Sequence, residues 1–316
     1  MGILFYIAKR LLITIPVLVG MSVLVFSLIH LVPGDPARVM LGLTATPQNI
    51  ATLRHQLGLD EALWRQYLTW LWQLLHGDLG TDFRSHEPLT QMLLRRLPVT
   101  LELTVLATVI AVVVAIPLGV FAAAKRRGAA DVTGTALSLV GISVPDFWLG
   151  VLLILLVSLR LKWLPPSGYR PISDGLIDNL RYMALPAITL SLSMAAVLMR
   201  TTRAAMTEVL DQEFIKFARA KGIRERLVVY KHALRNASIP IVTVLGLQFG
   251  YLLGGAVIVE TMFSLPGIGK MTLNAVNTRS YPIVQGGVLV IGLLFMLVNL
   301  ATDLLYAVLN PRIRYE

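Results

Sequence analysis

Two short stretches of the chain contain residue types used in nucleotide or metal chemistry, but neither has the required spacing. Gly267-Ile268-Gly269-Lys270 has the last glycine and the lysine of a phosphate-binding loop. That motif also needs a glycine at position 264 and Ser or Thr at 271, where the chain has Ser264 and Met271. His86-Glu87 begins like a metalloprotease motif, yet position 90 is Thr90. We therefore expect no catalytic site in this chain. If the protein works with ATP, we expect the nucleotide to be bound by another protein.

Metal-ligand and nucleophile patterns are also absent from the sequence. There are no cysteines and five scattered histidines, so no thiolate site, disulfide framework or zinc-ligand spacing is present. No Gly-x-Ser-x-Gly elbow occurs either. The sequence predicts no metal site and no cofactor in this chain.

One acidic residue stands within an apolar stretch. Asp146 follows Pro145, about 13 residues into the segment Thr133–Leu159, and an aspartate at mid-bilayer costs about 2.5–3.5 kcal/mol. Proline removes a backbone donor and can break a helix. Either a broken helix places Asp146 on a polar translocation path, or the membrane span begins near Pro145. Other ionisable residues, nearer the ends of apolar segments, are expected at the lipid headgroups: His30, Glu102, Glu260 and Asp303.

The composition explains what these residues are set into. The 316 residues are 56% hydrophobic and 15% charged, whereas soluble domains carry about 25% charged residues. Apolar blocks of about 20 residues suit a hydrocarbon core roughly 30 Å thick. We predict an all-α, polytopic bundle of about six membrane helices, with spans at Leu11–Leu31, Val99–Ala124, Thr133–Leu159, Leu180–Met199, Ile239–Val259 and Val284–Leu309. The first resembles a signal peptide only in its charged start, so we expect it to stay uncleaved.

The positive charges predict the orientation. The net charge is +10, and the basic residues cluster beside the ends of apolar blocks, which indicates a lipid bilayer as partner and not nucleic acid. The runs Lys125-Arg126-Arg127 and Arg200 to Arg235 fall on one side. The positive-inside rule therefore predicts both termini in the cytoplasm.

The stretch between the first two spans is the one sizeable region expected outside. We divide the chain into 1–32 (N-terminus and first span), 33–98 (extracytoplasmic segment) and 99–316 (core, with a cytoplasmic loop at about 200–236). Within 33–98 the pattern predicts amphipathic helices at Asn49–Leu59 and Leu63–Leu75, the second supplying interfacial aromatics at Trp64, Tyr67, Trp70 and Trp72. This segment is either a packing cap or a docking surface for another protein.

Small residues at four-residue spacing predict close helix packing, because apolar burial does not drive association in lipid. The fifth span contributes Gly246, Gly250 and Gly254, and the second contributes Ala111, Ala115, Gly119 and Ala123. Such faces serve packing inside one bundle or packing against a partner subunit.

The loop before the fifth span is the most informative stretch. Glu208–Ala220 is compatible with a helix that stops at Gly222, and its apolar residues predict a stripe: Val209, Leu210, Phe214 and Phe217. A short amphipathic helix of this kind either binds a partner's groove or lies on the headgroups.

Several motifs of the chain, taken in order, are similar to those of one family. Phe217 to Gly222, followed by His232 to Pro240, resembles the coupling loop of binding-protein-dependent ABC importer permeases of the dipeptide, oligopeptide, glutathione and nickel group. In place of that loop's usual acid and two alanines, the chain has Lys216, Phe217 and Ala218. Further matches are His30 to Pro36, His76 to Gly80, Pro98 to Leu103, Phe263 to Gly269, Tyr281 to Gln285 and Asn310 to Arg314.

The resemblance implies a type I importer permease in a bacterial cytoplasmic membrane. It implies a second homologous permease, two ABC ATPase subunits that hold ATP and Mg, and an extracytoplasmic substrate-binding protein. It also implies ATPase-coupling residues in this chain, for which we take Glu213, Phe217, Ala218, Arg219, Ala220 and Gly222. A peptide is the expected substrate, with glutathione or a nickel chelate as the alternative.

Two other classes remain as alternatives. An ion-gradient-driven transporter predicts inverted repeats and several deep acids, but no repeat is evident and only Asp146 is deep. An intramembrane enzyme needs a nucleophile and a base, and no such pair is evident.

Overall fold

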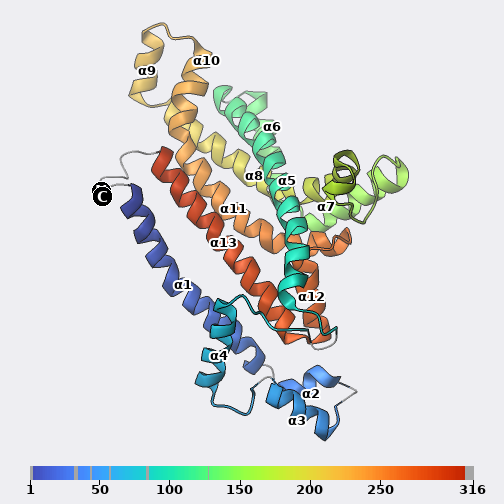
Figure 1. Ribbon diagram of the computed structural model, residues 1–316. Helices are drawn as coiled ribbons and strands as arrows, with labels where there is room; N and C mark the ends of the chain where they lie inside the picture. The colour runs from blue at the N-terminus through green and yellow to red at the C-terminus, as the bar shows by residue number, and fades with distance from the viewer. Residues whose placement is uncertain are drawn as a thin grey trace. The chain divides into compact units, whose positions relative to one another are not determined.

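The structure is a computed structural model, which describes residues 3–31, 35–42, 45–56, 58–82, 85–126 and 128–309. These residues form helices joined by turns, with no β-strand among them (Figure 1). The motif at Asn310 to Arg314 lies outside the described residues.

Five helices are long and apolar enough to cross a membrane, and a bent pair makes up to six. This confirms the predicted all-α membrane bundle of about six spans. The five are α1 (Ile3–Leu31), α5 (Leu89–Ala124), α8 (Leu176–Leu210), the run of α10 (Glu225–Leu227), η4 (Val228–Ala233) and α11 (Leu234–Met262), and α13 (Tyr281–Leu309). The bent pair is α6 (Ala129–Ser143) with α7 (Asp146–Leu153) and the π-helix η2 (Ile154–Arg160).

The third predicted span is not one continuous helix. α6 ends at Ser143, α7 begins at Asp146, and the two segments are bent by 98°. Pro145 lies at the break in extended conformation. Proline has no backbone N–H to donate to the preceding turn and disfavours helical conformation at Val144, so α6 ends before it. The prediction of a possible break at Pro145 is confirmed, and the span predicted over Thr133–Leu159 is a bent pair of helices.

The fourth predicted span is longer than expected. α8 runs for 35 residues through Pro186 and through the stretch assigned to the start of the cytoplasmic loop. Arg203 remains in the helix and is paired with the buried Asp131 of α6. Hydropathy predicts an end at Met199, because charged residues follow. The helix continues because Arg203 has an ion-pair partner on α6.

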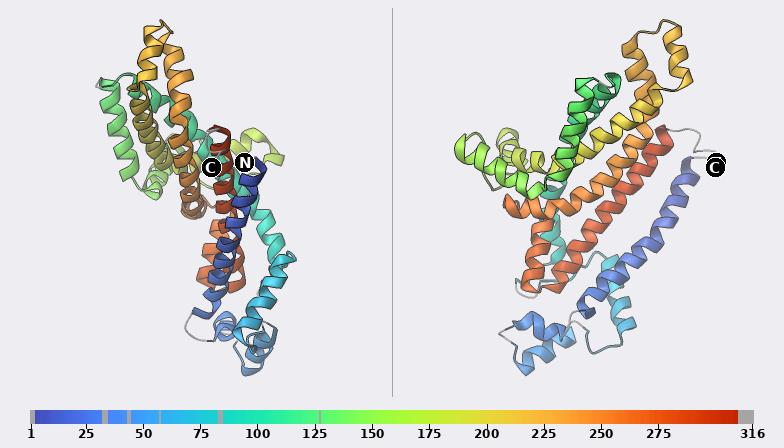
Figure 2. Two further views of the ribbon diagram at one scale, coloured as in Figure 1. Left: turned by 90° about the vertical axis from the view of Figure 1, so that its left-hand side faces the viewer. Right: turned by 180° about the vertical axis from the view of Figure 1, so that it is seen from behind.

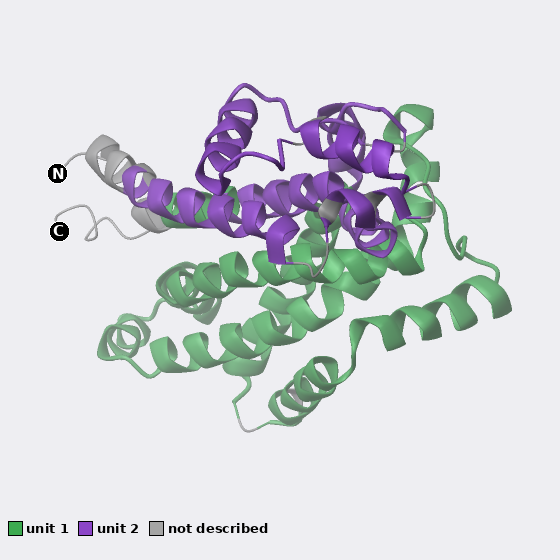
Figure 3. Cartoon of the chain, turned by 90° about the horizontal axis from the view of Figure 1, so that it is seen from below, with its two compact units in different colours: residues 1–7, 100–265, 297–316 green, residues 8–99, 266–296 purple. Residues whose placement is uncertain are grey.

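The chain divides into two compact units, coloured in Figure 3: residues 1–7, 100–265 and 297–316 form unit 1, and residues 8–99 and 266–296 form unit 2. Unit 1 contains α6–α11 and most of α5. Its largest apolar cluster joins residues of α5, α8, α9 (Glu213–Ala220), η4 and α11, among them Ala115, Met206, Ile215, Val228 and Ile241. α9 and α10 project beyond the ends of α8 and α11 (Figure 2).

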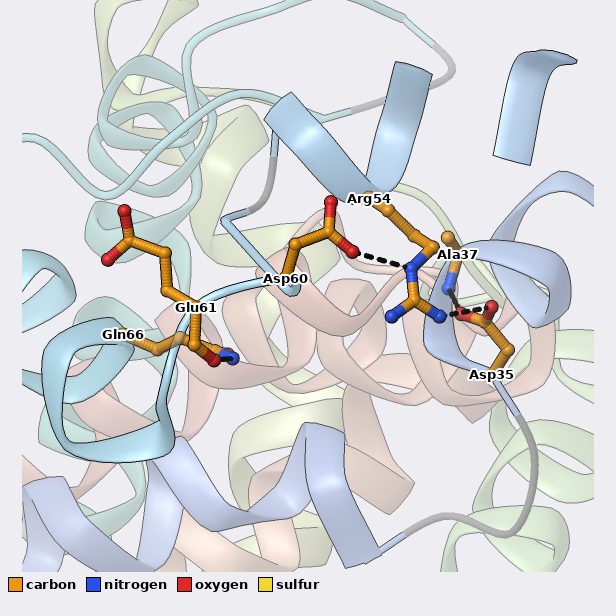
Figure 4. Close-up of polar contacts among 6 residues, drawn as sticks. All are labelled: Asp35, Ala37, Arg54, Asp60, Glu61 and Gln66. Carbon is orange, nitrogen blue, oxygen red and sulfur yellow. Dashed lines mark hydrogen bonds and ion pairs between the residues drawn. The ribbon is translucent and has the colours of Figure 1, made fainter. Parts of the chain in front are cut away.

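Unit 2 contains the short helices α2 (Pro36–Leu41), α3 (Pro47–Gln56), α4 (Leu63–Leu75) and α12 (Ile268–Thr278). Arg54 of α3 donates to both Asp35 and Asp60 at 2.9 Å, and Asp35 also caps α2 through the amide of Ala37 (Figure 4). One guanidinium thus ties together α2, α3 and the turn before α4. The bounds of α4 are those predicted, whereas the helix predicted at Asn49–Leu59 is found as α3.

Candidate functional site

The best-defined candidate site is the turn-rich stretch after α8, residues 211–227, which we call the α9 hairpin. The helix predicted over Glu208–Ala220 is interrupted, because α8 ends at Leu210 and Gln212 is extended before α9 begins. Gly222 then reverses the chain with φ +71°, a conformation that residues with a Cβ rarely adopt. The break allows α9 to pack back against the elements around it.

The α9 hairpin has an apolar anchor of its own. Ile215 is fully buried and Ala218 is 8% exposed, and both pack in the cluster that contains Val209, Val228 and Val229. Burying a side chain the size of isoleucine contributes about 1.5–3 kcal/mol. The hairpin is therefore shaped by this chain's own contacts.

The predicted apolar stripe is divided between two environments. Val209 and Leu210, at the end of α8, pack in the chain's own core. Phe214 and Phe217 on α9 remain 41% and 62% exposed. Two phenylalanines three residues apart on a helix share a face, and an exposed apolar patch on an otherwise charged element marks an interaction site.

Ion pairs brace the α9 hairpin. Arg219 donates two hydrogen bonds to Glu225, at 2.7 and 3.1 Å, and this carboxylate raises the pKa of Arg219 above its ordinary value. Lys216 pairs with Glu213 at 2.7 Å, and Arg126 from the turn after α5 pairs with Asp211 at 2.6 Å. Exposed pairs stabilise by at most about 1 kcal/mol each, so they orient the hairpin more than they hold it.

The six residues assigned to ATPase coupling do not share one environment. Glu213, Phe217, Ala220 and Gly222 are exposed. Ala218 faces the chain's own core, and the guanidinium of Arg219 is engaged by Glu225. Phe214 is also exposed and joins these four exposed residues as a candidate contact. The sequence predicted Phe214 only as part of the apolar stripe.

Asp146 is the first residue of α7 and is half-buried. Its carboxylate lies where α7, α8 and α11 meet: a Cβ built on Gly255 of α11 would be 3.9 Å from Oδ2 of Asp146 and 3.2 Å from Leu190 of α8. The acid thus lies at the bend and packs among helices.

Glu260 differs from its expected setting at the headgroups. It is fully buried in unit 1 and accepts a hydrogen bond of 2.6 Å from the hydroxyl of Thr100. Glu102 accepts a hydrogen bond of 2.9 Å from Tyr169, and burial, followed by this bond, raises the pKa of Tyr169 to about 12. Thr100 and Glu260 are 160 positions apart, so no local pattern in the sequence signals their pairing.

The two small-residue faces have different uses. Ala111, Ala115 and Ala123 are buried, and a Cβ on Gly119 would lie 2.8 Å from the backbone oxygen of Met199, so this face packs against α8. Gly246 is buried, and a Cβ there would overlap the side chain of Thr302 on α13. Further along α11, Gly250 is half-buried and Gly254 is exposed, with no described residue within 4 Å of a Cβ built on it. Within this chain the predicted face on α11 is occupied at Gly246 and open at Gly254.

Among the described residues, no group of three or more His, Asp or Glu side chains is placed to hold a metal ion.

Comparisons with known proteins match nearly the whole length of the chain. The family model described as binding-protein-dependent transport system inner membrane component matches residues 115–315, and the model of the N-terminal part of such components matches residues 3–104. The dipeptide transport system permease protein DppB of Escherichia coli (strain K12) is 43% identical, over 98% of this chain and 99% of its own. The glutathione transport system permease protein GsiC of Pectobacterium atrosepticum is 45% identical, over 98% and 99%.

A solved structure of the MetNI methionine ABC transporter, in inward-facing conformations, matches with a TM-score of 0.57 and 19% identity. The match covers 70% of this chain and 97% of that one. At this identity the match shows a shared fold.

Proposed function

The chain belongs to the family of binding-protein-dependent transport system inner membrane components, and we propose that it is the permease subunit of an ATP-driven importer of di- or oligopeptides. The names of the relatives support this substrate class, since DppB is a dipeptide permease. Glutathione is a tripeptide derivative, and the similarity to GsiC makes it the alternative substrate. A nickel chelate is a more distant alternative on the same scaffold.

The observation that carries the proposal is the α9 hairpin, an anchored element with two exposed phenylalanines. We propose that α9 binds in a groove of an ATPase subunit, since a helix with an exposed apolar face typically binds in a hydrophobic groove. We assign ATP and Mg to two such ATPase subunits, as the resemblance to importer permeases implies; the sequence of this chain has no complete phosphate-binding motif. A second permease of the same family completes the translocation path, and an extracytoplasmic binding protein delivers the solute.

The mechanism is rigid-body switching and involves no chemistry in this chain. When the ATPases close on ATP they displace the α9 hairpin, and the buried Ile215 and Ala218 transmit that displacement to α8 and η4. Asp146, at the bend beside α8 and α11, is our candidate for the path between the two permeases. Both termini lie in the cytoplasm in this scheme, on the side that carries the hairpin.

The test is a pull-down of the tagged chain from detergent-solubilised membranes, followed by reconstitution of what co-purifies. We expect a second permease and ATPase subunits, and uptake of labelled dipeptide that needs ATP and the binding protein. Competition by glutathione at lower concentration than by dipeptides would transfer the assignment to glutathione. Isolation of the chain without an ATPase, with uptake driven by an ion gradient, would contradict the proposal.

A further inference from the structure

A polar cavity of about 360 Å³ lies in unit 1, between the end of η2 and the start of α8. The side chains that matter for its chemistry are Ser158, Lys162, Arg170, Asp178 and Arg181. The cavity thus has three cationic groups and one carboxylate in its wall. Its size is within the range of about 300–1,000 Å³ typical of small-molecule sites.

Two of the three cations are not neutralised. Arg170 faces Asp178 at 3.5 Å and stacks over the ring of Tyr182 at 6.0 Å. Lys162 and Arg181 form no ion pair with any residue that the structure describes. Lys162 also has φ +56°, a backbone conformation that costs of order 1 kcal/mol or more for a residue with a Cβ. The cavity therefore has an excess of two positive charges and suits an anion.

Ser158 is an independent sign that a ligand belongs here. Its side chain is 7% exposed, and its hydroxyl is buried with no hydrogen-bond partner among the described residues. Among the described residues of unit 1, the hydroxyls of Thr202 and Thr207 on α8 are likewise buried without a partner, whereas Thr189 on the same helix donates to the carbonyl of Leu185. Ser158 lies instead in the π-helix η2, a form of helix that is frequent at functional sites. An unsatisfied buried hydroxyl costs about 1–3 kcal/mol, which a bound acceptor would remove.

The surroundings of the cavity identify the kind of anion. The apolar bent pair ends at Arg160, so the cavity begins where a membrane segment ends. Trp163 lines the cavity and is 67% exposed, and the residues next in sequence to lining residues, Leu161 and Ile177, are 49% and 77% exposed. A small soluble anion would make no contact with these apolar side chains. A phospholipid has a phosphate for the cations and acyl chains for the apolar side chains. Basic pockets at helix ends and tryptophan at the interface are the known elements of headgroup binding.

We propose that Ser158, Lys162, Arg170 and Arg181 form a binding site for the phosphate of an anionic phospholipid. The two unpaired cations supply charge-assisted hydrogen bonds to the phosphate oxygens, and the hydroxyl of Ser158 donates a third. The acyl chains lie along Leu161 and Trp163. The lipid would brace the end of η2 against the start of α8.

Native mass spectrometry of the purified chain in detergent tests this site. Short-chain phosphatidylglycerol is titrated onto the wild-type chain, onto Lys162→Gln/Arg181→Gln and onto the matched control Arg160→Gln, whose side chain does not line the cavity. Loss of charged hydrogen bonds predicts at least about tenfold weaker binding to the double variant only. Ser158→Ala, a small change, should weaken binding several-fold and serves if the double variant fails to fold.

Two further arms distinguish the sources of phosphate. Phosphatidylcholine with the same acyl chains should bind the wild-type chain and the double variant equally weakly. Inorganic phosphate at equal concentration should not displace phosphatidylglycerol. Equal affinity of phosphatidylglycerol for wild-type chain, double variant and Ser158→Ala would overturn the site, and displacement by inorganic phosphate would overturn its assignment to lipid.

A second inference concerns α4 and rests on different contacts, all within unit 2. No residue of α4 is fully buried. Tyr67 and Trp70 are half-buried and face α1, while Trp64, Leu68, Trp72 and Leu75 are 53–74% exposed. At 100° per residue these four fall within one arc of the helix, and the polar residues Arg65, Thr69 and Gln73 fall on another.

The contacts to α1 show how far α4 lies along that helix. The hydroxyls of Tyr67 and Ser22 are hydrogen-bonded at 2.9 Å, the rings of Tyr67 and Phe26 are 5.4 Å apart, and His30 contacts Gln66 at 3.1 Å. Ser22 precedes the end of α1 at Leu31 by nine residues, which is about 14 Å at 1.5 Å per residue. The hydrocarbon core is about 30 Å thick, so Tyr67 reaches a level well inside one leaflet.

We infer that α4 is embedded in the leaflet at the carboxyl end of α1, with lipid covering Trp64, Leu68, Trp72 and Leu75. A helix packed beside the membrane-embedded part of α1 meets acyl chains on its free apolar side. Its polar arc, with Arg65, Thr69 and Gln73, then faces the headgroups.

Site-directed spin labelling tests this placement. The sequence contains no cysteine, so each label attaches only at the introduced position. Trp72→Cys and Gln73→Cys are adjacent in sequence and on different arcs, as are Leu68→Cys and Thr69→Cys. In proteoliposomes of the full chain, labels at 72 and 68 should collide several-fold more with oxygen than with a water-soluble nickel chelate, and labels at 73 and 69 the reverse. Equal access of the chelate to all four positions, or shielding of 72 and 68 from both reagents, would overturn the inference.

Discussion

The helices α4 and α9 are both short and amphipathic, and both carry exposed aromatic side chains, but they are held in different ways. α9 has eight residues and buries Ile215 and Ala218 in the chain's own core. α4 has thirteen residues and buries none of them fully. The shape of α9 is therefore set before any partner binds, whereas α4 relies on a half-buried contact with α1 and on whatever covers its free face.

The residues left exposed fit this difference. α9 presents Phe214 and Phe217 among charged side chains, a surface that suits a protein groove. α4 presents Trp64 and Trp72, and tryptophan is enriched at membrane interfaces because its ring is apolar with one polar NH. An exposed apolar patch is thus assigned to protein or to lipid by its anchoring and its residue types. Four substitutions test this contrast.

The largest effect is expected at Gly222. Gly222→Asp places a Cβ and a charge at φ +71° in the turn that closes the α9 hairpin, although no described residue lies within 4 Å of that Cβ. We expect loss of peptide uptake with normal membrane insertion, measured by transport of labelled dipeptide and by the amount of chain in membranes. Gly58→Asp, at φ +63° and equally open in unit 2, is the matched control and should retain uptake. Wild-type uptake by Gly222→Asp would remove the coupling role from the hairpin.

The anchor of α9 is tested by Ile215→Ala. Truncating a fully buried isoleucine costs about 2–5 kcal/mol, which here loosens the hairpin from α8 and η4. Trypsin cleavage at Lys216, Lys221 and Arg224 should become much faster in the isolated chain. Unchanged cleavage would mean that α9 does not depend on its anchor.

The free face of α9 is tested by Phe217→Ala, which removes a 62% exposed ring. The trypsin resistance of the isolated chain should stay close to wild type, while ATPase recovery in the pull-down falls, since a buried aromatic at an interface is worth about 2 kcal/mol or more. Ile215→Ala and Phe217→Ala therefore separate anchoring from binding. If Phe217→Ala also opened the hairpin, the two faces of α9 would not be independent.

The smallest effect is expected on α4. Tyr67→Phe removes the hydroxyl that bonds Ser22 and leaves the ring against Phe26, which predicts a loss of about 1 kcal/mol. Mobility of a spin label at Gln73→Cys should rise slightly, and peptide uptake should remain. Ser22→Ala should give the same change, and the double variant should add nothing to it. Additive effects would show that the two hydroxyls do not act on one another.

Much of the fold follows from local sequence patterns. Apolar length identifies the bilayer as solvent and places the spans, and the bounds of α4 follow from its 3.6-residue period. The family, too, is evident from motifs in order, and the comparisons confirm it. These features depend on residues close together in the chain, so a single sequence suffices for them.

Other features depend on residues far apart in the chain. A prolyl residue at 145 suggests a break, but neither the 98° bend nor the packing of α7 on α8 and α11 follows from it. The periodicity of 208–220 predicts one stripe, yet Val209 is buried and Phe217 exposed because the chain turns at Gln212. Glu260 pairs with Thr100 and Arg203 with Asp131 across helices that share no local pattern. Period and composition say that a helix has an apolar face, and only contacts between distant segments decide which part of that face the chain covers itself and which part it leaves for protein or lipid.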